Sequence, residues 1–416
     1  MSYTLLRGSF VIRYADQPRQ GPQPDGDTVK FRPDTPGLVE ALPRPSGVPP
    51  DLNGRGISVR LEAVDALETH FGETHQELAG ARAARDDLLA RLGFSNVVYF
   101  DDLPNTVQSA DRDEVRGYVL SNGIDANGRM IGFVYPGDHP GPDGTGVFLD
   151  EALADQSANA QLLASGLAFP AFYATLPATL RTHLAEVSRT ARNAGLSVRG
   201  RAVGDPDGPA TVADLAGAEA LAIWPKLFRR LVPYFAAGFP DLDDFDTWLR
   251  ADPVHRDDTL FLLETAEQGN LHDVVSASGH EFRLTRWPED FVISPDPVTG
   301  DGGSKPAVVP GAVMIVAALP DPVGADLGNE SVTVLNTTAE PVDLAGWALV
   351  DTARGRHVLG QSLAGGEAVR VPLGNGVALG NTGDTLTLVD PKGMTVDKVD
   401  YKAGQVRSGR TIVFGR

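Results

Sequence analysis

Apolar residues follow strand-like spacing in some parts of the chain and helical spacing in others. In the first two hundred residues, β-branched and aromatic residues gather in six short runs, which is typical of strands. Residues 76–92 repeat apolar positions every three or four residues, which predicts a helix, and residues 159–167 and 178–194 are two further predicted helices. The proline-rich residues 33–50 predict a surface loop. The predicted strands are residues 9–14, 28–31, 57–64, 96–100, 117–120 and 130–135.

Helical spacing continues in the middle of the chain. Residues 221–235 carry apolar residues at helical intervals, with Pro225 near the start. Residues 246–250 and 258–268 are also predicted to be helical, and residues 281–293 to be extended. We therefore expect a mostly helical middle segment.

The last hundred residues return to strand-like runs separated by turns. Their spacing suits a β-sandwich. The runs are residues 332–335, 347–350, 368–371 and 385–388.

Two stretches rich in helix and strand breakers divide the chain. Residues 204–209 and residues 294–306 have the Pro, Gly, Ser and Asp content of linkers. A chain of 416 residues is also too long for one ordinary core. We expect three parts: residues 1–203, residues 204–305 and residues 306–416.

The negative net charge of the chain argues against a nucleic-acid partner, but does not exclude one. Its net charge is −19, distributed as −6, −11 and −2 over the three expected parts, so the acidity is concentrated in the middle. A divalent cation bound by carboxylates would reverse the local field in the first part.

The chain has no apolar run of eighteen residues and no visible signal peptide, so we expect no membrane span and a cytoplasmic protein, or a secreted one if the N-terminus was trimmed. The absence of cysteine leaves the compartment open.

Three short motifs in the first part carry candidate chemistry. They are residues 25–30 (DGDTVK), residues 60–68 (RLEAVDALE) and residues 127–129 (NGR). Phosphodiester hydrolysis needs a Lewis acid, a base for water and positive groups for the developing charge. Asp27 and Asp65 offer the hard oxygen ligands that suit Ca²⁺.

The spacing within the second motif makes a structural demand. In a continuous strand, Arg60 and Asp65 would point to opposite faces, because their separation is odd. For both to reach one phosphate, the strand has to end or bulge near Val64 and the chain has to turn at Asp65.

These motifs, in this order, resemble the staphylococcal nuclease (thermonuclease) family, and the resemblance covers about residues 1–203. It implies an OB-fold-like β-barrel with packed helices and calcium-dependent hydrolysis of DNA or RNA that leaves a 3′-phosphate. It further implies a role for each matched residue: Asp27, Asp65 and the carbonyl of Ala66 as Ca²⁺ ligands, Glu68 as the carboxylate that orients water or acts as general base, and Arg60 and Arg129 as phosphate and transition-state contacts.

The sequence departs from the family pattern at several positions. Ala66 and Leu67 replace the usual Thr and Pro, and Ala126-Asn127 replaces a Lys-Tyr pair. The aromatic pair expected to bind substrate corresponds to Phe172 and Tyr173, which the pattern alone also allows as core residues.

A further departure concerns Glu62. The family usually has an apolar residue there, and Glu62, on the strand face of Arg60, could pair with that arginine.

The last part resembles the lamin-tail domain, an immunoglobulin-like sandwich. Residues 329–336, 342–349, 381–388 and 396–401 carry the resemblance, and Leu344, Trp347 and Leu349 are predicted core residues. The resemblance implies an interaction or tethering module, with a protein or a surface as its partner.

Three functions remain open from the sequence. The first is an active Ca²⁺-dependent nuclease with a nucleic-acid substrate. The second is a catalytically weak or inactive nucleic-acid-binding barrel, and the third is an adaptor in which the sandwich is the working part. The presence of Asp27, Asp65, Glu68 and both arginines favours the first.

Overall fold

The computed structural model of the protein describes residues 2–252, 256–294, 312–324, 326, 328–338, 341–353, 355–374, 376–389 and 395–414. The chain forms two compact units, Met1–Thr299 and Gly300–Arg416. The boundary expected near residue 203 lies inside the first unit, and most of the linker expected at residues 294–306 lies outside the described residues.

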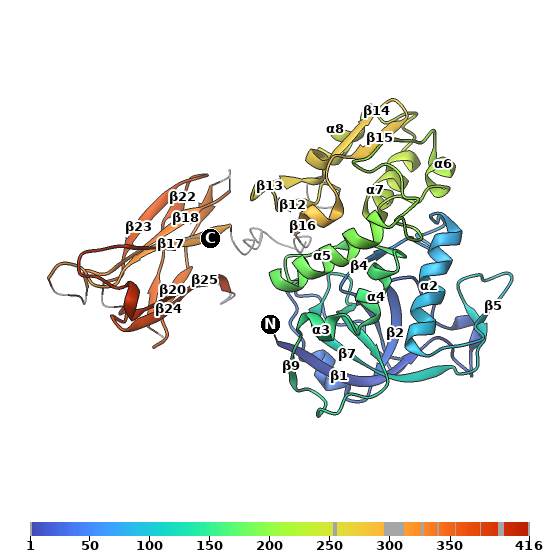
Figure 1. Ribbon diagram of the computed structural model, residues 1–416, viewed down its shortest axis with the longest axis horizontal. Helices are drawn as coiled ribbons and strands as arrows, with labels where there is room; N and C mark the ends of the chain where they lie inside the picture. Colours follow the sequence, from blue (N-terminus) through green and yellow to red (C-terminus); the bar gives the residue numbers. More distant parts are fainter. Residues whose placement is uncertain are drawn as a thin grey trace. The chain divides into compact units, whose positions relative to one another are not determined.

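The first unit is built on a closed five-stranded β-barrel, drawn in the lower part of Figure 1. Its strands follow the order β2-β3-β8-β7-β1, and β1 pairs with β2 to close the barrel. Only β3 and β8 among these neighbours run parallel. The barrel strands are β1 (Ser2–Val11), β2 (Thr28–Pro33), β3 (Ile57–Leu61), β7 (Glu114–Ile124) and β8 (Met130–Pro136).

Alternation along β2, β3 and β8 decides which side chains enter the barrel. Val29 pairs with Val59, and Val59 pairs with Met130, and all three are buried. Thr28 and Arg60, which also form a pair, therefore lie on the outer face. The apolar alternation of two short strands thus places Arg60 outside the core.

Helices pack around the barrel at the predicted places. Helices α2 (Leu78–Leu92), α4 (Ala158–Ala164) and α5 (Ala178–Asn193) coincide with the three predicted helices of the first part. The predicted loop at residues 33–50 contains one short helix, α1 (Pro36–Glu40), which begins at its proline. The remaining elements here are β4 (Ala63–Ala66), β5 (Val98–Tyr99), β6 (Val107–Ser109), β9 (Gly146–Phe148), α3 (Glu151–Ala154) and β10 (Ala168–Ala171).

The middle segment is less helical than predicted. Its described residues form three α-helices and six short strands. Residues 258–268, predicted as a helix, contain β12 and the first half of β13, an antiparallel pair. The physical reason is that β12 also pairs with β16 and buries Leu260 in the core, so tertiary pairing outweighs local helical spacing. The elements are β11 (Ala210–Thr211), α6 (Leu215–Glu219), α7 (Pro225–Ala236), α8 (Phe245–Arg250), β12 (Thr259–Leu262), β13 (Glu267–Asn270), β14 (Val275–Ser278), β15 (Glu281–Leu284) and β16 (Phe291–Ile293).

The middle segment shares its core with the barrel part. Leu67, Phe169 and Ala171 belong to the same buried cluster as Trp224 and Phe228 of the middle segment. Polar contacts also cross the expected boundary.

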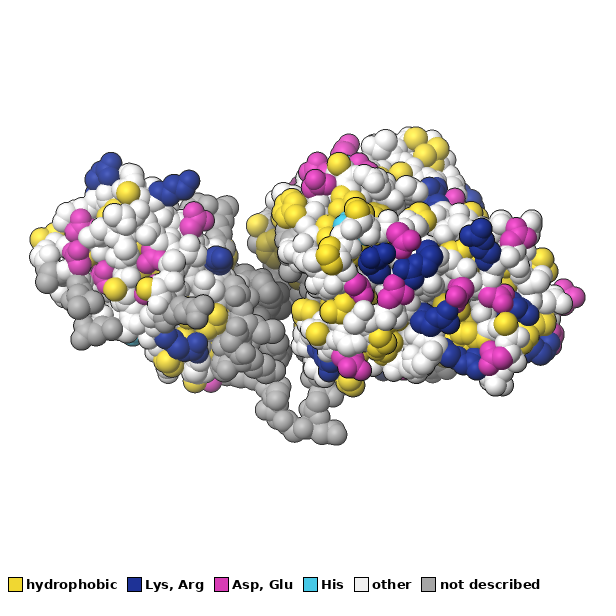
Figure 2. All heavy atoms as spheres, turned by 90° about the horizontal axis from the view of Figure 1, so that it is seen from below, with side chains coloured by type: hydrophobic (Ala, Val, Ile, Leu, Met, Phe, Trp, Pro, Cys, Tyr) yellow, Lys and Arg dark blue, Asp and Glu magenta, His cyan; other side chains and the backbone are white. Residues whose placement is uncertain are grey.

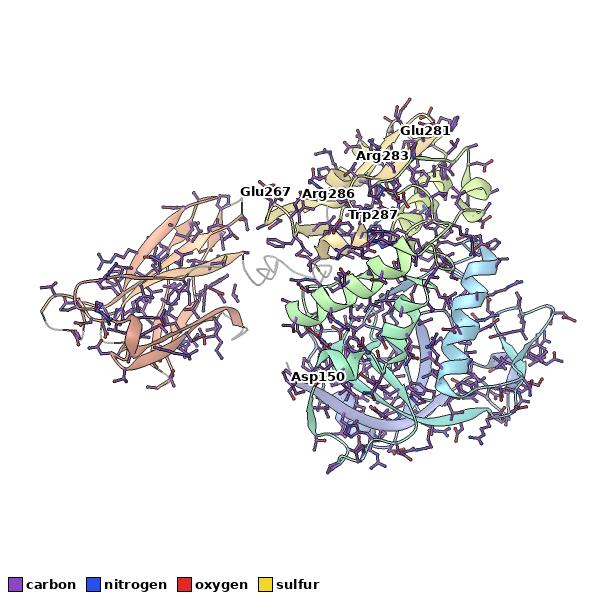
Figure 3. The ribbon with its side chains drawn as sticks, viewed as in Figure 1. Asp150, Glu267, Glu281, Arg283, Arg286 and Trp287 are labelled. Atoms are coloured by element: carbon purple, nitrogen blue, oxygen red, sulfur yellow. The ribbon has the colours of Figure 1, made fainter. Side chains whose placement is uncertain are left out.

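One of these contacts lies at the end of α5. Trp287 lies beside that end in Figure 3, and the guanidinium of Arg192 stacks 3.7 Å from its ring centroid. Arg199 donates to Glu289 at 2.7 Å, with both side chains buried. Residues 2–252 and 256–294 therefore pack as one compact unit around the barrel.

The second unit is a β-sandwich of two four-stranded antiparallel sheets, β23-β18-β17-β26 and β21-β20-β24-β25, with a small β19-β22 pair. Leu344, Trp347 and Leu349 are buried in its core, as predicted. In the described parts of the chain, no helix is long and apolar enough to cross a membrane. The strands are β17 (Val313–Leu319), β18 (Ser331–Asn336), β19 (Val342–Asp343), β20 (Ala348–Val350), β21 (Arg356–Val358), β22 (Ser362–Leu363), β23 (Ala368–Pro372), β24 (Gly383–Val389), β25 (Thr395–Lys402) and β26 (Ile412–Val413).

Candidate active site

A break between β3 and β4 brings Arg60 and Asp65 together. Ala63 has a φ of 68°, in the left-handed region, and this reverses the alternation of side chains between the two strands. After the break, β4 leaves the barrel and pairs with β10, with Asp65 opposite Phe169. The Arg60 guanidinium then donates to Asp65 Oδ1 at 2.5 Å. The predicted meeting of the two side chains is confirmed, and the break lies at Ala63 rather than at Val64 or Asp65.

The turn that begins the first motif adds Asp27 to this pair. The carbonyl of Asp27 accepts a hydrogen bond from the amide of Leu61 at 2.8 Å, and its Oδ2 accepts one from the amide of Ala66 at 2.9 Å. A Cβ on Gly26 would lie 2.5 Å from the Cβ of Ala66 and 2.8 Å from that of Ala84. The glycine therefore allows the turn to approach β4 and α2 closely.

Two guanidinium groups bridge the carboxylates of the site. Arg60 contacts Asp27 with one terminal nitrogen and Asp65 with the other. Arg229, from α7 of the middle segment, donates to Glu68 at 2.5 Å and to both oxygens of Asp65 at 3.0 Å. We name these five residues (Asp27, Arg60, Asp65, Glu68 and Arg229) the acidic cluster.

Burial and neighbouring charges act in opposite directions on the carboxylates. Burial raises the pKa of Glu68 to about 7, although the charge of Arg229 opposes this. Burial and the charge of Asp27 raise the pKa of nearby Asp25 to about 6. Burial would also raise the pKa of Asp65, but Arg229 and Arg60 overcome it and hold that pKa below its ordinary value. The two arginines thus favour the ionised form of Asp65, which is fully buried.

The donor set is suited to a hard cation. With Asp25, the site holds four carboxylates against two guanidinium groups, which leaves an excess of negative charge. All side-chain donors are oxygens, which suits Ca²⁺. Among the described residues, however, no group of three or more His, Asp or Glu side chains converges as around a metal ion. In the arrangement seen here, the arginines bridge the carboxylates that we expected to bind the metal.

Arg129 lies outside the acidic cluster but on the same face of the barrel as Arg60. It directly precedes β8, in which Ile131 pairs with Arg60, so Arg129 lies two residues before the partner of Arg60. Its Nε donates to Asp125 Oδ2 at 2.8 Å across the β7–β8 hairpin. A phosphate contact by Arg129 therefore stays a prediction.

The two aromatic residues predicted to bind substrate differ in position. Phe172 is fully buried in the barrel core, so its ring packs as a core residue and does not line a binding surface. Tyr173 is half-buried, and its ring lies 5.7 Å from the Nζ of Lys226. Tyr173 also interacts electrostatically with Arg60 and Arg229, so it borders the acidic cluster.

The expected pair between Glu62 and Arg60 is wrong. Glu62 precedes the backbone reversal at Ala63, is buried, and accepts a hydrogen bond from Asn122 at 3.1 Å. Burial raises its pKa to about 7. Arg60 instead points to Asp27 and Asp65.

Sequence reasoning missed Arg229 because no local motif contains it. The sequence pointed to Arg229 only indirectly. Arg229 and Arg230 are adjacent basic residues in the most acidic of the three expected parts, residues 204–305. They follow buried Leu227 and Phe228 on α7, and the helix packs against β4. Only that packing brings Arg229 to Asp65.

Comparisons with known proteins bear on the second unit. Residues 306–403 match the family model of the Lamin Tail Domain. This supports the resemblance inferred from the strand motifs of that part and the sandwich architecture seen there. No curated protein matches the chain.

Proposed function

We propose that the first unit is a calcium-dependent phosphodiester hydrolase that acts on DNA or RNA at the acidic cluster. One observation carries this proposal. Asp27, Arg60, Asp65 and Glu68, which the sequence motifs single out, are brought into one connected network by the fold. Arg229 joins Asp65 to Glu68 within that network.

The architecture supports a nucleic-acid substrate. A closed five-stranded barrel is the architecture of an OB-fold, which often binds oligonucleotides on one face. On the outer face, Lys30 lies two residues from Thr28, which pairs with Arg60, and Arg129 lies at the start of the neighbouring strand. A phosphate placed along this face would meet Lys30, Arg60 and Arg129.

Charged side chains of both signs share the surface of the first unit. On the side of the molecule shown in Figure 2, basic and acidic side chains of the first unit are interspersed. The net charge of −19 therefore does not describe each surface area. We expect modest affinity that weakens steeply with salt, because the contacts are mainly to phosphates.

The residues of the site can divide the chemistry between them. The Glu68 carboxylate would accept a proton from the attacking water, while the Arg60 and Arg129 guanidinium groups would each offer two hydrogen bonds to the phosphate. These contacts would strengthen as charge develops on the phosphate oxygens. Tyr173 borders the same site and would limit access of water.

Asp27, Asp65 and the carbonyl of Ala66 would hold the calcium ion. When bound, the ion supplies Lewis acidity to a phosphate oxygen. The all-oxygen donor set and the excess negative charge fit a hard cation in kind, while the carboxylates, which the arginines contact, would have to turn toward the ion.

A second function is favoured by one specific feature. Arg60 and Arg229 neutralise the carboxylates of the acidic cluster, as they would in a catalytically weak or inactive nucleic-acid-binding barrel. In that case the lamin-tail sandwich, as an interaction or tethering module with a protein partner, would be the working part of an adaptor.

The metal dependence of hydrolysis tests the proposal. Denatured DNA and RNA are incubated with the full-length protein in Ca²⁺, in Mg²⁺ and in EGTA. We expect cleavage in Ca²⁺, little in Mg²⁺, which requires near-octahedral geometry, and none in EGTA. Absence of cleavage in all three conditions would reject the nuclease, and retained oligonucleotide binding would then support the inactive barrel.

A further inference from the structure

We infer that Arg229 is a built-in competitor of the divalent cation: its guanidinium occupies Asp65 and Glu68, and calcium binds only when that contact opens. The inference rests on the proposed calcium site, and it assigns a role to a residue outside the nuclease-like part of the sequence. It makes the middle segment a determinant of metal affinity.

The geometry at Asp65 shows the competition directly. Oδ1 of Asp65 accepts hydrogen bonds from both Arg60 and Arg229, and Oδ2 accepts one from Arg229. Both carboxylate oxygens are therefore directed at guanidinium nitrogens. A metal ion needs lone pairs of the same oxygens. A carboxylate offers about four, and three accept guanidinium hydrogen bonds here, so the Arg229 contact leaves at most one for the ion.

Arg60 and Arg229 reach the site from different elements of the fold. Arg60 lies on β3, three residues before the backbone reversal, and contacts Asp27 as well as Asp65. Arg229 reaches the site from α7, and its second contact is Glu68, the proposed base. A small shift of α7 or of the side chain would release Asp65 and Glu68 together.

The charges favour a cation at this position. Removal of Arg229 takes one positive charge from Asp65 and Glu68 and leaves Arg60 in contact with Asp27 and Asp65, so the excess negative charge at the site increases by one. Because the side chains are largely buried, this charge is weakly screened by solvent. The neutralised site should therefore bind Ca²⁺ more weakly than the same site without Arg229.

The next residue of α7 provides a matched control. Arg230 makes a comparable contact at 2.6 Å to buried Asp258, which Lys226 also contacts at 2.6 Å. Arg229 and Arg230 have side-chain exposures of 19% and 14%. Substitution of Arg230 removes the same charge from the same helix without removing a contact to the acidic cluster.

The test is the affinity of the full-length protein for Ca²⁺, measured by isothermal titration calorimetry without substrate. We expect Arg229→Gln to bind Ca²⁺ at least tenfold more tightly than the wild type, and Arg230→Gln to stay within about twofold. Arg229→Lys should lie between the two, because an ammonium group keeps the charge but cannot bridge both carboxylates. Asp65→Asn should abolish Ca²⁺ binding both in the wild type and in the Arg229→Gln variant.

Each alternative result has a distinct meaning. Equal or weaker binding by folded Arg229→Gln, with the wild type still binding Ca²⁺ and cleaving DNA, overturns the competition and leaves the proposed function standing. If neither the wild type nor Arg229→Gln binds Ca²⁺, both the proposed competition by Arg229 and the proposed calcium site are overturned. If Arg229→Gln does not fold, Arg229→Lys with unchanged affinity overturns the inference.

Discussion

Two buried carboxylates on either side of the Ala63 break, Glu62 and Asp65, have opposite environments. Asp65 is fully buried and contacts two guanidinium groups, and its pKa is lowered. Glu62 is almost as buried, but its polar neighbours are the neutral amide of Asn122 and the hydroxyl of Tyr3, and burial raises its pKa to about 7. The two differ in their neighbours and hardly in their burial.

The difference shows which physical effect decides the charge of a buried acid. Desolvation acts on both groups in the same direction, against ionisation. Only the cations of Arg60 and Arg229 reverse its effect at Asp65. The backbone reversal at Ala63 therefore separates a carboxylate whose ionised form is stabilised from one whose ionisation above neutral pH destabilises the barrel.

Removal of Arg60 should have the largest effect on stability. Arg60→Ala leaves Asp27 and Asp65 without the guanidinium that joins them, and loss of one partner of a largely buried pair costs about 3–5 kcal/mol. Urea unfolding at pH 7 measures the loss. Arg55→Ala, which removes a more exposed pair with Asp16, is the control and should cost less than about 1 kcal/mol. An Arg60→Ala loss as small as that of the control would contradict the importance of the cluster for the fold.

Substitution of Glu62 should stabilise the protein in a pH-dependent way. The folded pKa is about 7 against about 4.5 when unfolded, so folding favours the protonated form, and this contribution is lost as pH rises from about 4.5 through about 7. Glu62→Gln should therefore match the wild type at pH 4.5 and exceed its stability at pH 8 by roughly 3 kcal/mol. Thermal or urea unfolding at the two pH values measures this. A gain that is equal at both pH values would show that ionisation of Glu62 is not the cause.

Removal of Arg129 should change the free energy of unfolding less than the substitutions of Arg60 and Glu62, but it should lower turnover strongly. Its pair with Asp125 is partly exposed, so Arg129→Ala should cost less than about 1 kcal/mol of folding free energy. If it contacts the phosphate mainly in the transition state, kcat should fall by about 10²–10³ with little change in oligonucleotide Kd. Arg129→Lys should recover part of the rate. Unchanged kcat in the folded alanine variant would leave Arg60 as the phosphate contact from the barrel.

The sequence predicts the parts of the site that lie in local motifs. The odd spacing of Arg60 and Asp65 demands a break, and the break exists because Ala63 adopts a left-handed conformation. Its position was missed by a residue or two, because an alanine carries no local signal for a positive φ. Placing Glu62 beside Arg60 assumed that the strand alternation continues through residue 62, whereas β3 ends at Leu61.

The contribution of the middle segment could not be predicted from the sequence. Arg229 meets Asp65 only because Leu227 and Phe228 bury α7 in a core shared with Leu67 and Phe169. Such long-range packing leaves no spacing pattern in the chain. The hairpin of β12 and β13 was missed for the same reason, since its strands are stabilised by pairing with each other and with β16.

The central claim is that the acidic cluster is a catalytic site, and turnover of Glu68→Gln tests it most directly. The substitution keeps the size of the side chain but removes the carboxylate that would accept a proton from water. The single-turnover rate on single-stranded DNA in saturating Ca²⁺ should fall by at least about 10²-fold, within the range for loss of a general base, while oligonucleotide Kd stays within a few-fold. A folded Glu68→Gln protein that cleaves at the wild-type rate would contradict the account.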